Sequence, residues 1–192
     1  MADAGRVIAG TARGIRLHAP GEGTRPLGDR VKQTLFAVLD PDLPGAAFLD
    51  LFAGSGAAGI EALSRGARHA TFVERDPGAA RVIATNLERA HLADRASVVR
   101  ADVTAWLRRA ASEAPGPFAV VVVDPPYDQP DLLVTVLEAL DALGPLLAPG
   151  ARVVAKHFWR DQPPTRVGLL ASERARRFGE TALTFYRREE QG

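Results

Sequence analysis

A glycine-rich loop directly follows a short apolar run, and this arrangement constrains the fold more than any other feature of the chain. Residues 49–62 read LDLFAGSGAAGIEA, and Gly54, Gly56 and Gly59 form a G-x-G-x-x-G pattern. The run 47–52 predicts a strand, and residues 59–67 predict a helix. The first glycine permits a tight turn, the second a close approach of the backbone to a ligand, and the third close helix packing. We therefore expect a strand, loop and helix unit that binds a nucleotide-like ligand.

Strand and helix patterns alternate on both sides of this loop. Further strands are expected at 70–74, 97–100, 118–124 and 151–158, and further helices at 77–92, 104–114 and 131–143. Such alternation predicts a parallel sheet with helices on both faces. The two ends read differently, with a hairpin at 6–20, a helix within 24–39 for which Asp29 is the expected N-cap, and two strands within 169–189. The last two strands predict an antiparallel edge.

Composition narrows the class of protein. The 192 residues suit one domain, and no apolar run reaches the roughly 18 residues of a membrane span. The N-terminus lacks the order of a secretory signal, and the chain has no cysteine, so a cytoplasmic location is expected. The four histidines show no ligand spacing, and we expect no metal.

Charge is distributed unevenly along the chain. Residues 1–32 hold six Lys or Arg against three Asp or Glu, residues 33–151 nine against fifteen, and residues 152–192 nine against five. Basic ends around an acidic middle fit an anionic partner, and they also fit a set of solvated surface arginines. Charge alone leaves both interpretations open.

Three carboxylates near the loop distinguish between possible cofactors. Glu74 ends the strand 70–74, where it can accept hydrogen bonds from ribose hydroxyls, a feature shared by NAD and S-adenosylmethionine. Asp50 lies four residues before Gly54, where it suits a methionine ammonium group and would repel a pyrophosphate. Asp102 follows the strand 97–100 and can accept from an adenine amino group. We therefore expect S-adenosylmethionine, and Asp50 disfavours an NAD-dependent oxidoreductase.

The fourth strand of the core runs directly into Asp124-Pro125-Pro126-Tyr127. The carboxyl end of a central strand is where such a sheet binds its substrate, and consecutive prolines make the turn stiff. Asp124 and the Pro125 carbonyl can accept the two hydrogens of an exocyclic base amine, while Tyr127 can stack on the base. In structured nucleic acid the base must first be flipped out. This turn predicts methyl transfer to an amino group of a base.

Several motifs together resemble a known family. D-x-F-A-G-S-G, F-V-E-R-D and D-P-P-Y resemble the methyltransferases of exocyclic base nitrogens. RVIAGTARGIRL with TRPLGDRVKQTLF is similar to the opening of the bacterial RsmD family, and RRFGETALTFYRRE is similar to its ending. Members methylate N2 of a guanine in 16S ribosomal RNA. The resemblance implies an α/β class I S-adenosylmethionine-dependent methyltransferase fold, Rossmann-like, with a seven-stranded mixed sheet and an N-terminal β-hairpin extension.

The resemblance also carries site residues onto this chain. The expected cofactor site comprises Thr24, Arg25, Pro26 and Arg30, which close over the methionine end, the loop residues Asp50, Phe52, Ala53, Gly54, Ser55 and Gly56, and the strand-end residues Glu74, Arg75, Asp102 and Val103. The expected catalytic residues are Asp124, Pro125, Pro126 and Tyr127. Residues 1–33 would form the hairpin and cofactor-closing segment, and residues 34–192 the Rossmann-like core of one domain. The expected partner is 16S rRNA or a 30S assembly particle, bound by a monomer.

Basic residues at both ends are the candidates for RNA contact. Arg13 and Arg16, in the hairpin, are expected to bind RNA. The C-terminal arginines would flank the same cleft if their strands lie beside 151–158; they are Arg174, Arg176, Arg177, Arg187 and Arg188. His157 and Trp159 are expected to be surface or packing residues, and Trp106 a core residue.

The chain departs from the family at a few positions. Members commonly have Thr where Leu27 stands, Arg where Lys32 stands, and an acidic residue near Lys156, so the stretch Lys156–Arg160 is atypical. Two alternative functions stay open at this point. One is a methyltransferase of the same fold that acts on adenine N6 or another exocyclic amine, since such enzymes share D-P-P-Y. The other is a non-catalytic RNA-binding assembly protein.

Overall fold

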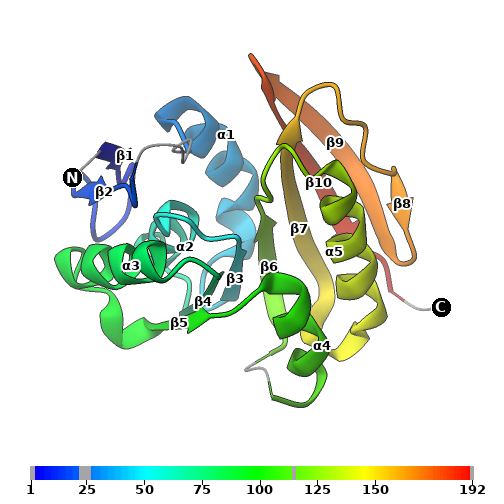
Figure 1. Cartoon of the computed structure of the whole chain (residues 1–192), viewed down its shortest axis with the longest axis horizontal. Helices are drawn as coiled ribbons and strands as arrows, with labels where there is room; N and C mark the ends of the chain where they lie inside the picture. The colour runs from blue at the N-terminus through cyan, green and yellow to red at the C-terminus, as the bar shows by residue number, and fades with distance from the viewer. Residues whose placement is uncertain (1–2, 22–26, 114–115, 191–192) are drawn as a thin grey trace.

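The computed structural model describes residues 3–21, 27–113 and 116–190. They form three layers, in which one large sheet lies between two layers of helices (Figure 1). Two short N-terminal strands form a separate hairpin, β1 (Asp3–Arg6) and β2 (Arg16–His18). The large sheet has eight strands: β3 (Ala47–Leu51), β4 (His69–Glu74), β5 (Ala96–Arg100), β6 (Phe118–Val123), β7 (Leu147–Phe158), β8 (Arg166–Val167), β9 (Leu170–Phe178) and β10 (Thr181–Arg188).

The strand order is β5-β4-β3-β6-β7-β10-β9-β8. The five strands from β5 to β7 are parallel, and β10 pairs antiparallel with both β7 and β9. The expected Rossmann-like α/β fold with its antiparallel edge is thus confirmed. The seven expected strands are joined by an eighth, because the two residues of β8 pair with the start of β9. The chain order reverses between β3 and β6, the point at which such sheets bind ligands.

Five helices cover the sheet among the described residues: α1 (Asp29–Leu39), α2 (Ala57–Ser64), α3 (Pro77–Arg89), α4 (Val103–Glu113) and α5 (Pro130–Ala142). None of these described helices has the length and apolar character needed to cross a membrane. The predicted N-cap of α1 is wrong: Gly28 holds that position, and Asp29 is the first helical residue. The Asp29 side chain instead faces Arg6 and Lys32.

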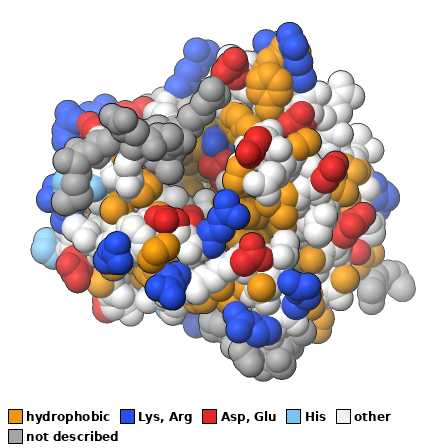
Figure 2. All heavy atoms as spheres, viewed as in Figure 1, with side chains coloured by type: hydrophobic (Ala, Val, Ile, Leu, Met, Phe, Trp, Pro, Cys, Tyr) orange, Lys and Arg blue, Asp and Glu red, His pale blue; other side chains and the backbone are white. Residues whose placement is uncertain are grey.

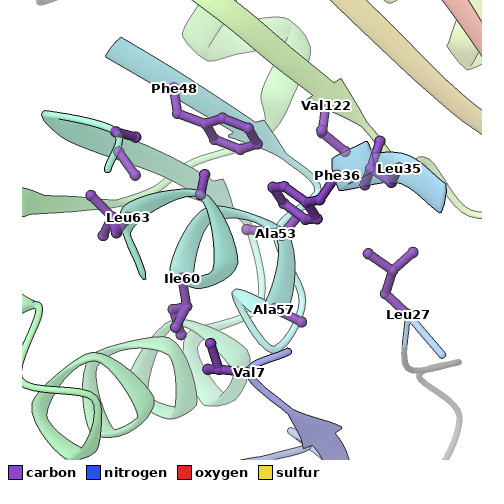
Figure 3. Packing of buried hydrophobic residues seen from close by; sticks show 14 of the residues in the cluster. Val7, Leu27, Leu35, Phe36, Phe48, Ala53, Ala57, Ile60, Leu63 and Val122 are labelled. Carbon is purple, nitrogen blue, oxygen red and sulfur yellow. The ribbon is translucent and has the colours of Figure 1, made fainter. Parts of the chain in front are cut away.

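Side chains that alternate along the central strands belong to two separate hydrophobic layers, one on each face of the sheet. Phe48 and Val122 belong to the layer under α1, α2 and α3, whereas Leu49 and Val121 belong to the layer under α4 and α5. This alternation follows from the two-residue period of a strand and explains why the central strands are apolar throughout. Figure 3 shows the first layer packed around the glycine loop, with side chains contributed by α1, α2 and the N-terminal segment.

Buried polar side chains attach the N-terminal hairpin to the core. Glu61 of α2 is fully buried and accepts hydrogen bonds from the backbone of Ile8 (2.7 Å) and Ala9 (3.0 Å). Asn86 of α3 is equally buried and pairs with the backbone of His18 in both directions. These bonds satisfy backbone groups that would otherwise be buried without partners, so the hairpin is held at a defined place beside α2 and α3.

Candidate active site

The loop after β3 has a backbone that few residues can adopt. Phe52 has φ +62°, a left-handed conformation that is costly for a residue with a bulky side chain. Gly54 and Gly56 follow with φ +56° and +75°. A Cβ added at Gly59 would lie 2.3 Å from the Phe72 ring, so α2 can pack on β4 only with glycine there. The glycines therefore bring the start of α2 and its free backbone amides close to the ligand position.

Asp50 lies beneath this loop. It is almost fully buried, and its Oδ2 accepts a hydrogen bond from the Gly59 amide at 2.9 Å. Burial raises the pKa of Asp50 to about 8, against the lowering effect of the Gly59 bond, and the charges of Asp124 and Glu74 add to the rise. The side chain thus fastens α2 to β3, and its raised pKa favours the neutral acid at neutral pH unless a cation binds beside it.

Glu74 and Asp102 stand at the ends of the next two strands. Glu74 accepts from the Gly54 amide (2.9 Å) with one oxygen and from the Asp76 amide (2.8 Å) with the other. Asp102 caps α4 through bonds from the Thr104 hydroxyl and the backbone of residue 105. These bonds, that from Thr104 foremost, lower the pKa of Asp102, so it stays ionised. Both carboxylates keep lone pairs available for a ligand.

A cavity of about 540 Å³ joins these elements to the D-P-P-Y turn, within the range typical of small-molecule sites. The predicted site residues that line it are Phe52, Gly54, Glu74, Arg75, Asp102, Val103, Asp124, Pro125, Pro126 and Tyr127. Ala53 and Ser55 line a smaller cavity behind the loop, together with Asp50 and Asp124. Acidic residues outnumber basic ones in the lining of both cavities, which suits a cofactor with a sulfonium, an ammonium and a free ribose. A pyrophosphate would meet repulsion here.

Only part of the segment expected to close over the methionine end of the cofactor lies within the described residues. Thr24, Arg25 and Pro26 lie outside the described residues. Arg30 is exposed on the first turn of α1 and is not among the described residues lining either cavity. Leu27 lines the smaller cavity. The closing role of this segment therefore stays a prediction.

The turn after β6 places a carboxylate against a lysine. Lys156 of β7 donates to both oxygens of Asp124, at 2.6 and 2.8 Å, and is itself buried. Its Nζ also lies 5.1 Å from the centre of the Tyr127 ring. The Tyr127 hydroxyl lies 2.8 Å from the Thr181 hydroxyl on β10. Side chains of β7 and β10 thus hold both ends of the turn, at Asp124 and at Tyr127.

Burial and pairing act in opposite directions on this ion pair. Burial raises the pKa of Asp124, and the adjacent Lys156 ammonium offsets part of that rise. For Lys156, burial lowers the pKa, but the charge and hydrogen bonds of Asp124 and Tyr127 outweigh it and raise the pKa overall. Lys156 is therefore a cation at neutral pH, and it favours the ionised form of Asp124.

Comparison with known proteins agrees with this geometry. The family model described as "Conserved hypothetical protein 95" matches residues 5–187. Ribosomal RNA small subunit methyltransferase D of Escherichia coli (strain K12) is 36% identical over 188 residues, 97% of this chain and 91% of that protein. YlbH of Bacillus subtilis (strain 168) is 38% identical over 95% of this chain and 98% of its own. The structure of Escherichia coli yhhF has a TM-score of 0.82 at 35% identity, covering 97% and 98% of the two chains. This chain belongs to the RsmD family of ribosomal RNA methyltransferases.

Two features of this methyltransferase were not predicted. Lys156 was noted only as atypical, yet it contacts Asp124 directly. Trp159 was expected to be a packing or surface residue, and it is half-buried with the Arg177 guanidinium 3.6 Å from its ring centre. The Lys156 contact depends on the pairing of β6 with β7, and the Trp159 contact on the pairing of β7 with β10 and of β10 with β9. No local motif encodes these pairings.

The basic residues divide into separate groups. Arg13 and Arg16 are exposed in the N-terminal hairpin, where Arg16 pairs with Asp3 at 2.6 Å. The hairpin and β9 lie on opposite sides of α1 (Figure 1). The expectation for two C-terminal arginines is wrong. Arg187 binds Asp42 and the Gly150 carbonyl, and Arg188 binds the Leu147 carbonyl, so both lie at the start of β7 and far from its catalytic end.

Within the described residues, no three His, Asp or Glu side chains converge to hold a metal ion. That the reaction uses no metal stays a prediction, as does the monomeric state.

Proposed function

We propose that this chain methylates the exocyclic N2 of a guanine in 16S ribosomal RNA during assembly of the small subunit. S-adenosylmethionine is the methyl donor. The observation that carries the proposal is the position of Asp124. Its carboxylate lines both cavities beside the glycine loop and begins the rigid turn that faces the larger one. A base amine bound by this carboxylate would sit next to the reacting end of the cofactor. An rRNA substrate also implies the cytoplasm.

When bound, S-adenosylmethionine supplies an electrophilic methyl group on a sulfonium. The protein must supply position and acceptors, because the lone pair of a base amine is delocalised into the ring. Asp124 and the Pro125 carbonyl would accept the two N2 hydrogens and direct the lone pair toward the methyl group, and Tyr127 would stack on the base. As the N–C bond forms and the S–C bond breaks, N2 becomes positively charged. Its surplus proton can pass to Asp124, whose burial favours uptake.

The residues around the cofactor have separate roles in this proposal. Glu74 would accept hydrogen bonds from the ribose hydroxyls, and Asp102 from the adenine amine. Asp50 holds the loop from below through Gly59, and a methionine ammonium bound beside it would lower its pKa and favour the ionised carboxylate. Each role uses a carboxylate already fixed by backbone hydrogen bonds, so little reorganisation accompanies binding.

Guanine N2 must be distinguished from the other exocyclic base amines that an active site of this kind could methylate. An adenine-N6 methyltransferase of the same fold would share the D-P-P-Y turn. The geometry of that turn is the same for guanine and adenine, so the test below distinguishes the two bases. A non-catalytic assembly protein is disfavoured, because RNA binding alone requires neither the shaped cofactor cavity nor the acceptor turn.

Nucleoside analysis of the reaction product tests the proposal. The purified protein would be incubated with S-adenosylmethionine and unmethylated 16S rRNA, either free or within a 30S particle, and the RNA then digested for mass spectrometry. We expect N2-methylguanosine at one position, and the two arms identify the preferred substrate. N6-methyladenosine would support the alternative enzyme, and no methylated nucleoside in either arm would support the assembly protein.

A further inference from the structure

A row of aromatic side chains leads away from the catalytic turn. The rings of Tyr127 and Phe158 have centroids 6.3 Å apart, and those of Phe158 and Trp159 are 6.2 Å apart. Trp159 then contacts two guanidinium groups, with Arg177 at 3.6 Å and Arg160 at 5.0 Å from its ring centre. We call these five residues the aromatic–basic row.

Strand pairing brings these residues together. Thr181, the first residue of β10, is paired with Phe158 on one side and with Phe178 on the other. The end of β7 and the end of β9 therefore flank the same residue, and the Trp159 amide donates to the Glu180 carbonyl at 2.9 Å. The row thus runs from the hydrogen-bonded end of β7 into the turn that follows it, and the backbone bond of Trp159 fixes the start of this turn.

Several arginines lie in this row or on β9 beside it. Arg160, Arg174, Arg176 and Arg177 are all exposed, and none forms an ion pair with a carboxylate within the described part of the chain. Other arginines of the same sheet are paired, such as Arg152 with Asp42 and Arg166 with Glu189. In Figure 2 a band of hydrophobic side chains runs from the top of the molecule toward its centre, with Lys and Arg side chains at its top.

A second cavity lies at the base of the row. It has a volume of about 200 Å³, and Pro126, Tyr127, His157 and Phe158 are among its lining residues. Pro126 and Tyr127 line the large cofactor cavity as well, so the turn separates the two spaces. A nucleotide next to a target base at the turn would reach this second cavity and the row beyond it.

We propose that the aromatic–basic row binds the single-stranded RNA that flanks the target nucleotide. The three rings are half-buried and keep part of their surface open to solvent. Aromatic rings stack on unpaired bases of any sequence, and adjacent arginines bind the phosphates between them. The row begins at the catalytic turn, so RNA bound along it also positions the target base. This inference rests on the proposed rRNA substrate, and it assigns to the atypical stretch Lys156–Arg160 a role in holding that substrate.

Tryptophan fluorescence gives a direct test. The chain has two tryptophans, and Trp106 is a buried residue of α4, so Trp106→Phe leaves Trp159 as the single reporter. A short single-stranded RNA oligonucleotide with the sequence around the methylated position would be titrated, with a duplex of the same sequence beside it. We expect quenching by the single strand and much weaker quenching by the duplex.

Variants then measure the contribution of each part of the row. Trp159→Ala should weaken single-stranded RNA by about 5- to 150-fold, the range for loss of one stacked base. Trp159→Phe should restore most of the affinity, because it keeps a ring. Arg160→Ala with Arg177→Ala should lower the slope of log affinity against log salt by roughly 0.7 per lost phosphate contact. Arg108→Ala, an exposed arginine on α4 at the bottom of Figure 1, is the matched control and should change neither quantity.

Two controls separate this inference from the proposed function. Wild-type methyl transfer to 16S rRNA reports the function, while oligonucleotide affinity of the variants reports the row. Unchanged affinity for S-adenosylhomocysteine shows that a variant is folded. The inference is overturned if an active wild type has variants that bind RNA normally with an unchanged salt slope. It is also overturned if the variants lose affinity only for 30S particles and not for RNA, since the row would then contact a protein.

Discussion

The cofactor side and the substrate side of the active site are built by different means. On the cofactor side, side-chain carboxylates hold the backbone of one continuous loop, through Asp50 to Gly59 and Glu74 to Gly54. On the substrate side, side chains from different strands hold one another, as in Lys156 with Asp124 and Trp159 with Arg177. The first side is preorganised by hydrogen bonds to the backbone of one loop, and the second depends on the register of several strands. The difference indicates that cofactor binding and RNA binding can be altered separately by mutation.

The largest effect on one side alone is expected for Asp124, which lies between the cofactor side and the substrate side. Asp124→Ala should lower kcat by at least about 100-fold, because it removes an acceptor at the reacting nitrogen. Affinity for S-adenosylmethionine, measured by calorimetry, should stay nearly unchanged. Asp124→Asn should keep more activity than the alanine variant, since its amide oxygen still accepts a hydrogen bond. Near-normal turnover of Asp124→Ala would refute the catalytic role.

A change on the cofactor side should have the opposite pattern. Glu74→Ala should weaken S-adenosylmethionine and S-adenosylhomocysteine alike by about 1–3 kcal/mol, because charged hydrogen bonds to the ribose are lost. RNA affinity should not change. Glu88→Ala, which removes an exposed carboxylate of α3, is the control for general charge effects in calorimetry. If Glu74→Ala bound the cofactor with wild-type affinity, Glu74 would not be the residue that binds the ribose.

The Lys156–Asp124 pair predicts a smaller effect that depends on pH. Burial raises the pKa of Asp124 and Lys156 offsets part of that rise, so Lys156→Met should raise the pKa further. Turnover needs the ionised carboxylate, and the acidic limb of the kcat–pH profile should therefore move to higher pH. Lys156→Arg keeps the positive charge and should restore much of the wild-type profile. A uniform loss of rate at every pH would instead indicate a purely structural role for Lys156.

The smallest effect is expected at the hairpin, remote from the cofactor loop. Arg13→Ala with Arg16→Ala should weaken substrate RNA and flatten its salt dependence, each lost phosphate contact lowering the slope by roughly 0.7–0.9. Arg16 already pairs with Asp3, which limits its contribution. Affinity for S-adenosylmethionine should not change. A double variant with normal RNA affinity and an unchanged slope would place the RNA elsewhere, such as on the aromatic–basic row alone.

The same contrast explains what could be predicted from sequence. The loop, Glu74 and the D-P-P-Y turn are contiguous motifs at strand ends, and a parallel sheet brings such ends to one edge. Lys156 could not be assigned because its partner Asp124 is set by the register of β6 against β7, which pairs Val123 with Ala155. Trp159 could not be assigned because its partner Arg177 is set by the register of β10, which places Phe158 and Phe178 on either side of Thr181. Arg187 and Arg188 were misplaced for the same reason, since β10 runs antiparallel to β7 and carries them to the opposite end of the sheet.

A crystal structure of the protein with S-adenosylhomocysteine would test the central claim most directly, namely that the cofactor cradle presents its reacting end to the Asp124 turn. We predict that the ribose hydroxyls bond to the Glu74 carboxylate, that the adenine lies beside Asp102 and Val103, and that the sulfur faces Asp124. An adenosine bound in the second cavity at Tyr127 and Phe158, or a sulfur directed away from Asp124, would contradict the proposed arrangement.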